Sequence, residues 1–215
     1  MFRIPLKVDN DSTCNIDVKS YLAELIRKTD LVIWDEAVTA HKHIFMAMDR
    51  TFRDILNKSE PIASKCYFAN KLILFGGDFR QILPVIKKGN RSKIVDSTLK
   101  KSSFWNGINK CQLTDNMRIK SAAINIAKPI ELLNEFAKYL IKIGEGLIET
   151  IKDSKFIDEI LLPSNIAKNM DESELIESVF PEIETNAFNV EFMSTRAILA
   201  TKNSTVDKIN DLAIK

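Results

Sequence analysis

The sequence has 215 residues, of which 45% are hydrophobic and 28% are charged, so it excludes a disordered or low-complexity protein and allows a sizeable core. No run of about 18 apolar residues occurs, and the N-terminal segment lacks a signal core or an Arg-rich presequence, so we expect an intracellular chain without a membrane span. The 3 cysteines are isolated and form no CxxC pair, which argues against a disulfide framework or a zinc module and favours reduced, mostly buried thiols.

The charge is distributed unevenly, although the net value is only +2. Residues 87–120 hold nine Lys or Arg against two Asp or Glu, whereas residues 121–215 hold ten against 16. A basic segment of this kind attracts a polyanion such as nucleic acid, but it is also compatible with a solvated lysine-rich face.

The first part of the chain alternates between helical and strand patterns. Apolar residues at helical spacing predict helices over residues 18–28 and 41–57. The short apolar runs LVIW (31–34) and KLILF (71–75) are typical of strands buried on both faces of a parallel sheet. This alternation predicts an α/β domain.

The later part of the chain is more helical and more acidic. Pro129 suits the first turn of a helix that ends at Gly144, and its apolar stripe is expected to be core. Residues 145–190 are weakly patterned and predict a connector.

Residues 171–207 contain the start signals of two helices and the pattern of one strand. Asp171 and Glu174 predict a capped helix, and RAILA (196–200) predicts a short strand. Ser204 with Asp207 resembles a capping box that opens a last helix.

The stretch LVIWDEA places Asp35 and Glu36 at the end of the first predicted strand. Ligands of open α/β sheets bind at the carboxyl ends of strands, and triphosphate hydrolysis needs a divalent cation and an oriented water. Asp35 is therefore a candidate for Mg²⁺ binding through water, and Glu36 for polarising the nucleophile. A strand end followed by a helix cap is the alternative.

The stretch FGGDFRQILPV (75–85) places a second polar cluster after the second strand. The glycine pair lets backbone approach a ligand closely, and Gln81 is able to donate to a γ-phosphate and accept from water. The alternative is a glycine turn with a surface Gln. In LTDNMRI, Arg118 is suited to a phosphate, although a single arginine within a basic segment is weak support.

Two further groups leave alternatives open. His41 and His43 stand beside the carboxylate pair, but their spacing favours surface histidines over metal ligands. Phe104 and Trp105 lie in the basic segment, where aromatic rings either stack on bases or pack in a core.

LVIWDEA, FGGDFRQILPV and LTDNMR, in this order and with these gaps, resemble the Pif-type DNA helicases of superfamily one, in particular the eukaryotic group that includes Helitron helicases. FRIPL, STCNI, DRTFRDIL and RAILATKN are similar to the same group. The resemblance implies a RecA-like P-loop NTPase fold, in which a parallel sheet is flanked by helices. The domains expected from it are a first RecA-like domain over residues 1–128, a helical, acidic connector over 129–190 and the start of a second RecA-like domain over 191–215.

The resemblance also implies an activity, namely ATP-dependent 5′-to-3′ translocation on single-stranded DNA and unwinding of duplex DNA. Its cellular settings are DNA repair, recombination, telomere maintenance or transposition, in the nucleus or, as the alternative, the mitochondrion. Carried over by residue, Asp35 and Glu36 match the Mg²⁺ and water pair, Gln81 the γ-phosphate sensor and Arg118 the arginine of the fourth motif. Asp78 and Arg80 would couple the strand end to the cleft and to DNA. Lys87, Lys88 and Arg91 are further candidate DNA contacts because they lie in the basic segment.

The sequence departs from the family pattern in one respect that affects activity. A phosphate loop of the form GxxxxGK(S/T) is expected before residue 1, and the chain contains no Gly-Lys dipeptide. Without a lysine and backbone amides around the phosphates, we expect this chain alone to be inactive as an ATPase. The alternative function is a catalytically inactive helicase remnant that binds nucleic acid or a partner chain.

Overall fold

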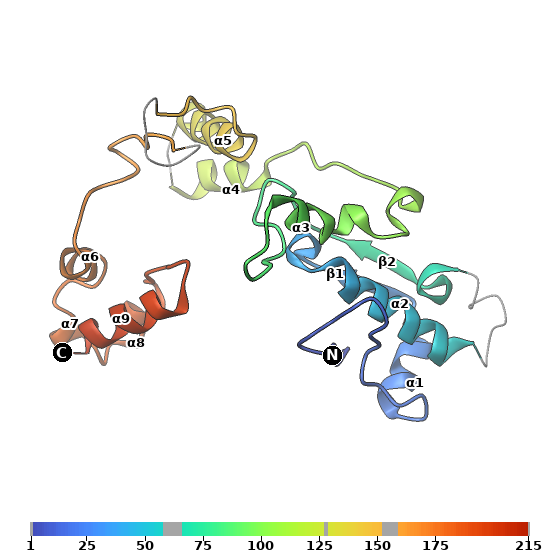
Figure 1. The fold of residues 1–215 in the computed structure, drawn as a ribbon. Helices are drawn as coiled ribbons and strands as arrows, with labels where there is room; N and C mark the ends of the chain where they lie inside the picture. Colours follow the sequence, from blue (N-terminus) through green and yellow to red (C-terminus); the bar gives the residue numbers. More distant parts are fainter. Residues whose placement is uncertain (1, 58–65, 127–128, 152–158, 215) are drawn as a thin grey trace. The chain divides into compact units, whose positions relative to one another are not determined.

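The structure, a computed structural model, describes residues 2–57, 66–126, 129–151 and 159–214 (Figure 1). It divides into two compact units, Met1–Ile148 and Glu149–Lys215, and each is described by itself. The predicted boundary at residue 128 lies outside the described residues, and the three-part domain division remains a prediction. Within the described residues, no helix has the length and apolar character needed to cross a membrane.

Unit 1 alternates helices and strands in the order that the sequence predicts. Its elements are α1 (Tyr21–Lys28), β1 (Leu31–Trp34), η1 (Ala37–Thr39), α2 (Lys42–Leu56), η2 (Tyr67–Asn70), β2 (Leu72–Phe75), α3 (Arg91–Asp96), η3 (Leu99–Lys101), η4 (Trp105–Gly107), α4 (Met117–Ile126) and α5 (Ile130–Gly144).

The two strands pair in parallel, with Leu31 opposite Leu72 and Trp34 opposite Phe75. Side chains alternate along each strand, so one sheet face packs against α2, while the other exposes four large apolar residues: Leu31, Ile33, Leu72 and Leu74. The prediction of strands buried on both faces is therefore wrong for this structure, because α2 and the 3₁₀ turns after β2 lie on the same side of the sheet.

Aromatic residues from several elements form the core of unit 1. Phe45 of α2 is fully buried, and its ring centroid lies 4.8 Å from that of Trp34 and 5.4 Å from that of Phe75. Phe104 stacks on Phe75 at 5.9 Å and is buried. The core alternative is therefore the correct one for Phe104.

The helix ends follow capping chemistry. Ser20 caps α1 by accepting a hydrogen bond from the Ala23 amide at 3.2 Å, and Ala23 and Ile26 are buried. His41 caps α2, the helix predicted over residues 41–57. The thiols are all free, but only Cys14 among them is buried.

Helix α5 forms where the sequence predicts it, with Pro129 as its N-cap. Its apolar stripe was expected to be core, and this expectation is wrong: Leu132, Phe136 and Leu140 are exposed. Among the described elements, α4 is the main one that packs against α5, and neither strand covers the remaining apolar side chains of the helix.

Unit 2 is a small group of helices: α6 (Glu172–Val179), α7 (Ile183–Asn186), α8 (Val190–Ser194) and α9 (Asn203–Ala213). The predicted capping box of Asp171 and Glu174 is confirmed at α6. Residues 196–200 form no strand, because unit 2 offers no neighbouring strand among its described residues. Lys202 is the N-cap of α9 and makes no side-chain cap, so the capping box predicted at Ser204 is wrong.

Candidate nucleotide site

The carboxyl ends of β1 and β2 are joined by backbone hydrogen bonds. The Ala37 amide donates to the Gly76 carbonyl at 2.8 Å, and the Gly76 amide donates to the Trp34 carbonyl at 2.9 Å. The residues that follow the two strands therefore lie side by side, as expected for adjacent parallel strands.

The two glycines of the second cluster lie close to the segment after β1, and at Gly77 the approach leaves no room for a side chain. A Cβ atom on Gly76 would lie 3.4 Å from Oδ1 of Asp35, and one on Gly77 would lie 2.9 Å from Cγ1 of Val38. Gly77 also has a φ of +159°, at the margin of the region that side chains rarely adopt. The glycine turn thus places backbone next to the Asp35 carboxylate.

The carboxylate pair is exposed and locally ordered. Oδ1 of Asp35 accepts a hydrogen bond from the Glu36 amide at 2.9 Å. Glu36 has a φ of 52° and a ψ of 37°, the left-handed conformation, which costs a non-glycine residue roughly 1–2 kcal/mol. Strain of this kind persists where the surrounding structure fixes the backbone, and it is common at functional sites.

The turn after Gly77 is closed by Asp78 and Arg80. The Arg80 amide donates to Oδ1 of Asp78 at 2.9 Å, and Nε of Arg80 donates to the same atom at 3.0 Å. These bonds lower the pKa of Asp78 below its ordinary value and raise that of Arg80, which also faces Glu145. The Gln81 amide donates to the Asp78 carbonyl at 3.0 Å, so Gln81 belongs to the same turn, with an exposed side chain.

Arg118 lies on a different element, in the first turn of α4, and is exposed. Across the described residues, it has no hydrogen bond or ion pair with Asp35, Glu36 or Gln81. The structure therefore brings the carboxylates to the glycine turn that leads to Gln81, but it does not bring Arg118 into contact with them.

The donor set at this strand end fits Mg²⁺ rather than a metal that needs a full protein cage. Within the described part of the chain, no group of three or more His, Cys, Asp or Glu side chains is placed to hold a metal ion. Mg²⁺ keeps several waters and binds proteins through one or two carboxylates plus phosphates, so the two exposed carboxylates fit the protein part of such a site.

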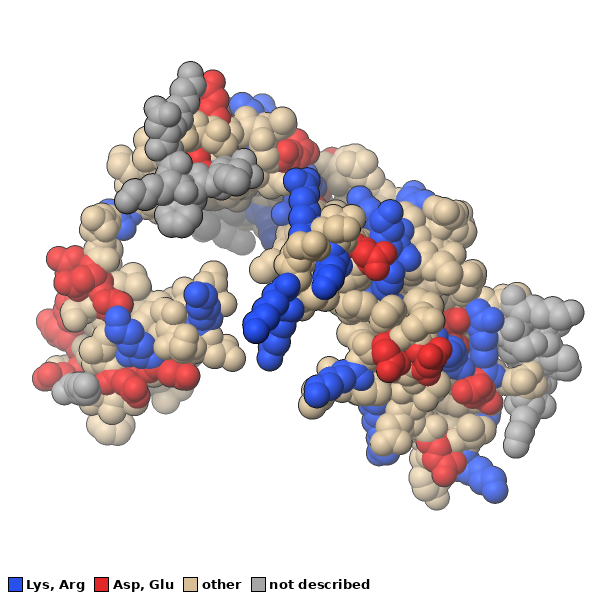
Figure 2. All heavy atoms as spheres, viewed as in Figure 1, with Lys and Arg blue, Asp and Glu red and all other residues tan. Residues whose placement is uncertain are grey.

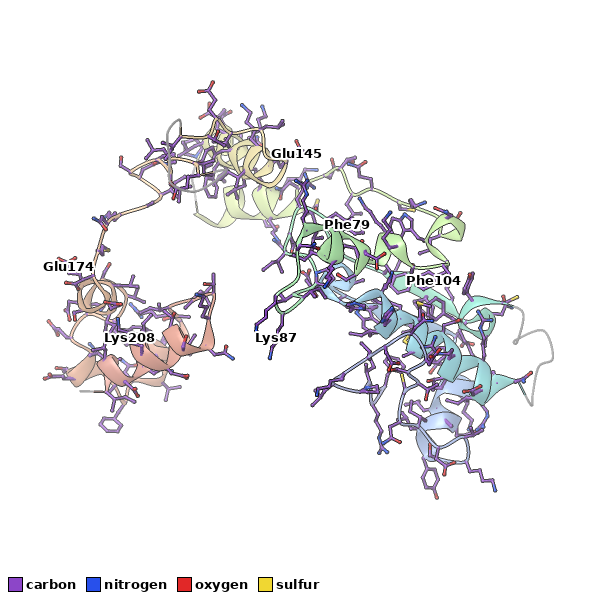
Figure 3. All side chains as sticks on the ribbon, in the orientation of Figure 1. Phe79, Lys87, Phe104, Glu145, Glu174 and Lys208 are labelled. Carbon is purple, nitrogen blue, oxygen red and sulfur yellow. The ribbon has the colours of Figure 1, made fainter. Side chains whose placement is uncertain are left out.

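The predicted DNA contacts lie mainly on the segment that follows β2. Lys87, Lys88 and Arg91 are exposed, and Arg91 begins α3. Figure 2 shows Lys and Arg side chains gathered near the centre of the view. Figure 3 shows the Lys87 side chain projecting away from the segment between β2 and α3. Asp96, one of the two acids in the basic segment, pairs with Lys42 at 2.9 Å.

Trp105 and Phe79 form an aromatic pair that the sequence analysis did not predict. Their ring centroids lie 5.6 Å apart in an edge-to-face arrangement. Nζ of Lys100 lies 4.1 Å from the Phe79 centroid, and Nζ of Lys110 lies 5.1 Å from the Trp105 centroid. Both rings pack against the core, and they border a cleft of 360 Å³ beside the glycine turn.

Gly144 and Glu145, at the end of α5, also contact Arg80 in the turn that carries Gln81. From the sequence, Gly144 is expected only to end a helix, and Glu145 has no expected role. No sequence signal indicates this contact, because it joins segments that are far apart in the chain.

The parallel strand pair with α2 on one face fits a partial RecA-like α/β fold. The sequence profile of PIF1-like helicases matches residues 1–154, well over half of the chain. The chain therefore belongs to the PIF1-like helicase family. No curated protein matches the chain.

Solved structures similar to the chain are also PIF1 helicases. Bacteroides Pif1 in complex with ADP-AlF3 and single-stranded DNA is 24% identical over 48% of this chain and 24% of its own, with a TM-score of 0.38. A Pif1 structure described for DNA unwinding at forked duplexes is 22% identical over 58% of this chain and 32% of its own, with a TM-score of 0.39. A double mutant of Bacteroides Pif1 is 16% identical over 84% of this chain and 42% of its own, with a TM-score of 0.42. The chain thus spans less than half the length of these helicases.

Proposed function

We propose that this chain carries the Mg²⁺ and water part of an ATP-dependent DNA helicase that moves 5′ to 3′ on single-stranded DNA and unwinds duplex DNA. The main supporting observation is the exposed pair Asp35 and Glu36, set beside a glycine turn at the common end of two parallel strands. The direction of movement is supported by the resemblance of the three motifs to Pif-type helicases.

Each residue has a distinct role in this proposal. Asp35 and Glu36 hold Mg²⁺, which when bound supplies positive charge to the phosphates of ATP. Glu36 polarises the attacking water, and Gln81 hydrogen-bonds that water and a γ-phosphate oxygen. Arg118 offers a permanent positive charge to the phosphates, which requires α4 to approach the strand ends when ATP is bound.

We further propose that the 215 residues alone hydrolyse ATP little, because they contain no Gly-Lys dipeptide and hence no phosphate-gripping lysine of the expected kind. The measurement is phosphate release from Mg²⁺–ATP, with and without single-stranded DNA, for the wild-type chain and for Glu36→Gln. Equal, background rates are expected for both. DNA-stimulated turnover that Glu36→Gln abolishes would contradict this proposal.

The DNA part of the proposal is tested by the salt dependence of binding. Lys87 and Lys88 are exposed in the basic segment, so the affinity for a labelled single-stranded oligonucleotide is expected to fall as salt rises. Replacing both by Gln removes two contacts and should reduce the slope of log affinity against log salt by about 1.4. The matched control replaces Lys7 and Lys19, two exposed lysines outside the segment, and should leave the slope unchanged. A flat salt response of the wild-type chain would remove the basic segment from the proposal.

The second candidate is a catalytically inactive helicase remnant that binds nucleic acid or a partner chain. The observation in its favour is the basic segment, which needs no nucleotide site to attract a polyanion. Mg²⁺ titration distinguishes the two candidates: the first predicts that Asp35→Asn with Glu36→Gln weakens Mg²⁺ binding by the chain, and an unchanged Mg²⁺ affinity together with intact DNA binding would favour the second.

The cellular setting is proposed from the resemblance alone. It comprises nuclear DNA repair, recombination and telomere maintenance or transposition, with the mitochondrion as the alternative location. Imaging of the tagged chain in cells tests the location directly.

A further inference from the structure

We propose that Gly144 and Glu145, at the C-terminal end of α5, are positioning residues for the turn that carries Gln81. The contact is defined by geometry alone, and its catalytic meaning rests on the proposed role of Gln81. In Figure 3, Glu145 lies at the end of α5.

The first observation is a close approach between α5 and the turn. A Cβ atom on Gly144 would lie 3.1 Å from Cβ of Arg80 and 3.5 Å from its Cγ and Cδ. Gly144 is the last residue of α5 and has no positive φ, so its backbone conformation does not call for a glycine, whereas a side chain here would press on Arg80. The aliphatic part of Arg80 therefore lies directly against the backbone of α5.

The second observation concerns charge. The Arg80 guanidinium pairs with Asp78 within the turn, and Nη1 of Arg80 lies 3.6 Å from Oε1 of Glu145. Both carboxylates raise the pKa of Arg80. Arg80 thus links a carboxylate of the turn to a carboxylate of α5.

The link reaches Gln81 through the backbone. The Gln81 amide donates to the Asp78 carbonyl, and the Arg80 amide donates to the Asp78 side chain, so these residues move as one hydrogen-bonded turn. Unit 2 begins at Glu149, and α5 is therefore the last helix before the chain leaves unit 1. A shift of α5 is transmitted through Arg80 to the turn, which couples the position of Gln81 to the segment that leads to unit 2.

A disulfide trap tests the contact in the full chain. Disulfides need Cβ atoms about 3.5–4.5 Å apart, so Arg80→Cys with Gly144→Cys should cross-link after a small adjustment, in a background where the exposed Cys111 is replaced by Ser. The control pairs Arg80→Cys with Gly107→Cys, because a Cβ atom on Gly107 meets nothing within 4 Å. Mass spectrometry should find the cross-link in the first pair only. Equal cross-linking in both pairs, or in neither, would overturn the proposal.

Local hydrogen exchange tests the positioning role. Gly144→Ala, which places a Cβ atom against Arg80, should accelerate amide exchange at Gln81 by about threefold or more and leave α2 unchanged. Glu145→Gln should do the same more weakly, and Glu145→Asp, which keeps the charge, should restore part of the protection. The matched controls are Gly107→Ala and Glu135→Gln, the latter an exposed glutamate on the same helix.

The outcomes separate this inference from the proposed function. If the cross-link forms and exchange at Gln81 responds, the positioning contact stands even when the chain binds neither DNA nor nucleotide. If exchange at Gln81 is the same in Gly144→Ala and Gly107→Ala, the positioning role is overturned even when DNA binding is found.

Discussion

Glu36 adopts a conformation that works against the stability of the chain. Its φ of 52° places a side chain in a region that glycine occupies freely, and the residue is exposed, so no packing offsets the cost. The conformation turns the chain directly after Asp35 and lets the Ala37 amide reach the Gly76 carbonyl. The strain is therefore part of how the two strand ends are brought together.

Glu36→Gly is expected to stabilise the folded chain by about 1 kcal/mol, because the relief of left-handed strain exceeds the entropy that glycine loses on folding. Chemical denaturation measures the free energy of unfolding. Glu36→Gln, which keeps the strain, is the control and should be neutral. A stability of Glu36→Gly at or below that of the control would show that the left-handed conformation is not strained.

His41 is expected to make stability depend on pH. Its Nδ1 accepts a hydrogen bond from the His43 amide at 3.1 Å, which caps α2 and requires a neutral ring. Burial, then the nearby charges of His43 and Lys42, lower the pKa of His41 below its ordinary value of 6.5, and Asp96 opposes this shift. The two rings lie 4.5 Å apart and are half-buried, whereas the sequence predicted surface histidines; the His41 ring caps the helix, and His43 supplies the backbone amide that donates to it.

The sign follows from the lowered pKa. The unfolded chain takes up the His41 proton first, so the stability that neutral His41 provides is complete above about pH 6.5 and is lost as pH falls toward the folded pKa. Denaturation midpoints at a series of pH values measure this loss. His41→Asn keeps a capping acceptor without a titrating ring, and it should flatten the dependence in that range. An unchanged pH dependence in His41→Asn would assign the titration to other groups.

The sequence predicted the positions of those site residues that directly follow a strand. Asp35 and Gly76 are adjacent because parallel strands end at the same sheet edge, which two apolar runs are enough to predict. The contact of Arg80 with Gly144 and Glu145 was not predictable, since it depends on where a separate helix packs.

At the scale of elements, α2 and the turn η2 depend on one buried carboxylate. Asp49 is buried, pairs with Nη2 of Arg53 at 2.8 Å and accepts a hydrogen bond from the Phe68 amide. Phe68 and Ala69 have φ values of 53° and 51°, so the turn needs an external contact to hold it. Asp49 supplies that contact from α2.

Asp49→Ala is expected to lower the free energy of unfolding by about 3 kcal/mol, because it leaves a buried amide unsatisfied and removes one partner of Arg53. Asp54→Ala is the control: it removes an exposed carboxylate from the same helix and should change stability by less than about 0.5 kcal/mol. Urea denaturation of both variants gives the comparison. Equal effects would mean that Asp49 does not anchor η2.

The elements predicted best are those whose pattern is local. Helices α2 and α5 follow from apolar spacing together with start or stop residues, and the capping box at α6 follows from Asp171 and Glu174. The strand predicted over 196–200 failed because a strand requires a partner, and an apolar run does not specify one.

At the scale of the whole chain, the two units differ in how much they bury. Unit 1 contains the aromatic core around Phe45, whereas the apolar residues described as buried in unit 2 are Ile176 and Ile209. An ion pair between Lys208 and Glu172 joins α9 to α6 at the surface. Unit 2 therefore has little burial to oppose local opening.

Hydrogen exchange followed by mass spectrometry should show this difference. Amides of α6 and α9 are expected to exchange at least tenfold faster than those of α2, because opening free energy scales with local burial. The control is to repeat the measurement below the denaturation midpoint at several urea concentrations, where the two units should lose protection separately. Protection that is lost in a single step throughout the chain would show one cooperative unit.

The sequence predicted the α/β class of the whole chain but not which surfaces are covered. An apolar run such as LVIW has the same pattern whether one face or both faces of its strand are packed. Coverage depends on the other elements that reach the sheet, and for the described residues these lie on one side of it.

The open sheet face has a practical consequence for handling the protein. Leu31, Ile33, Leu72 and Leu74 form adjoining exposed apolar side chains in the folded state, and we expect dyes such as anilinonaphthalene sulfonate to bind there. In a dye-based melting curve, the folded chain would therefore already give high fluorescence, and the further rise in fluorescence on unfolding would be small. Scanning calorimetry or far-ultraviolet circular dichroism is the sounder monitor for each of the variants above.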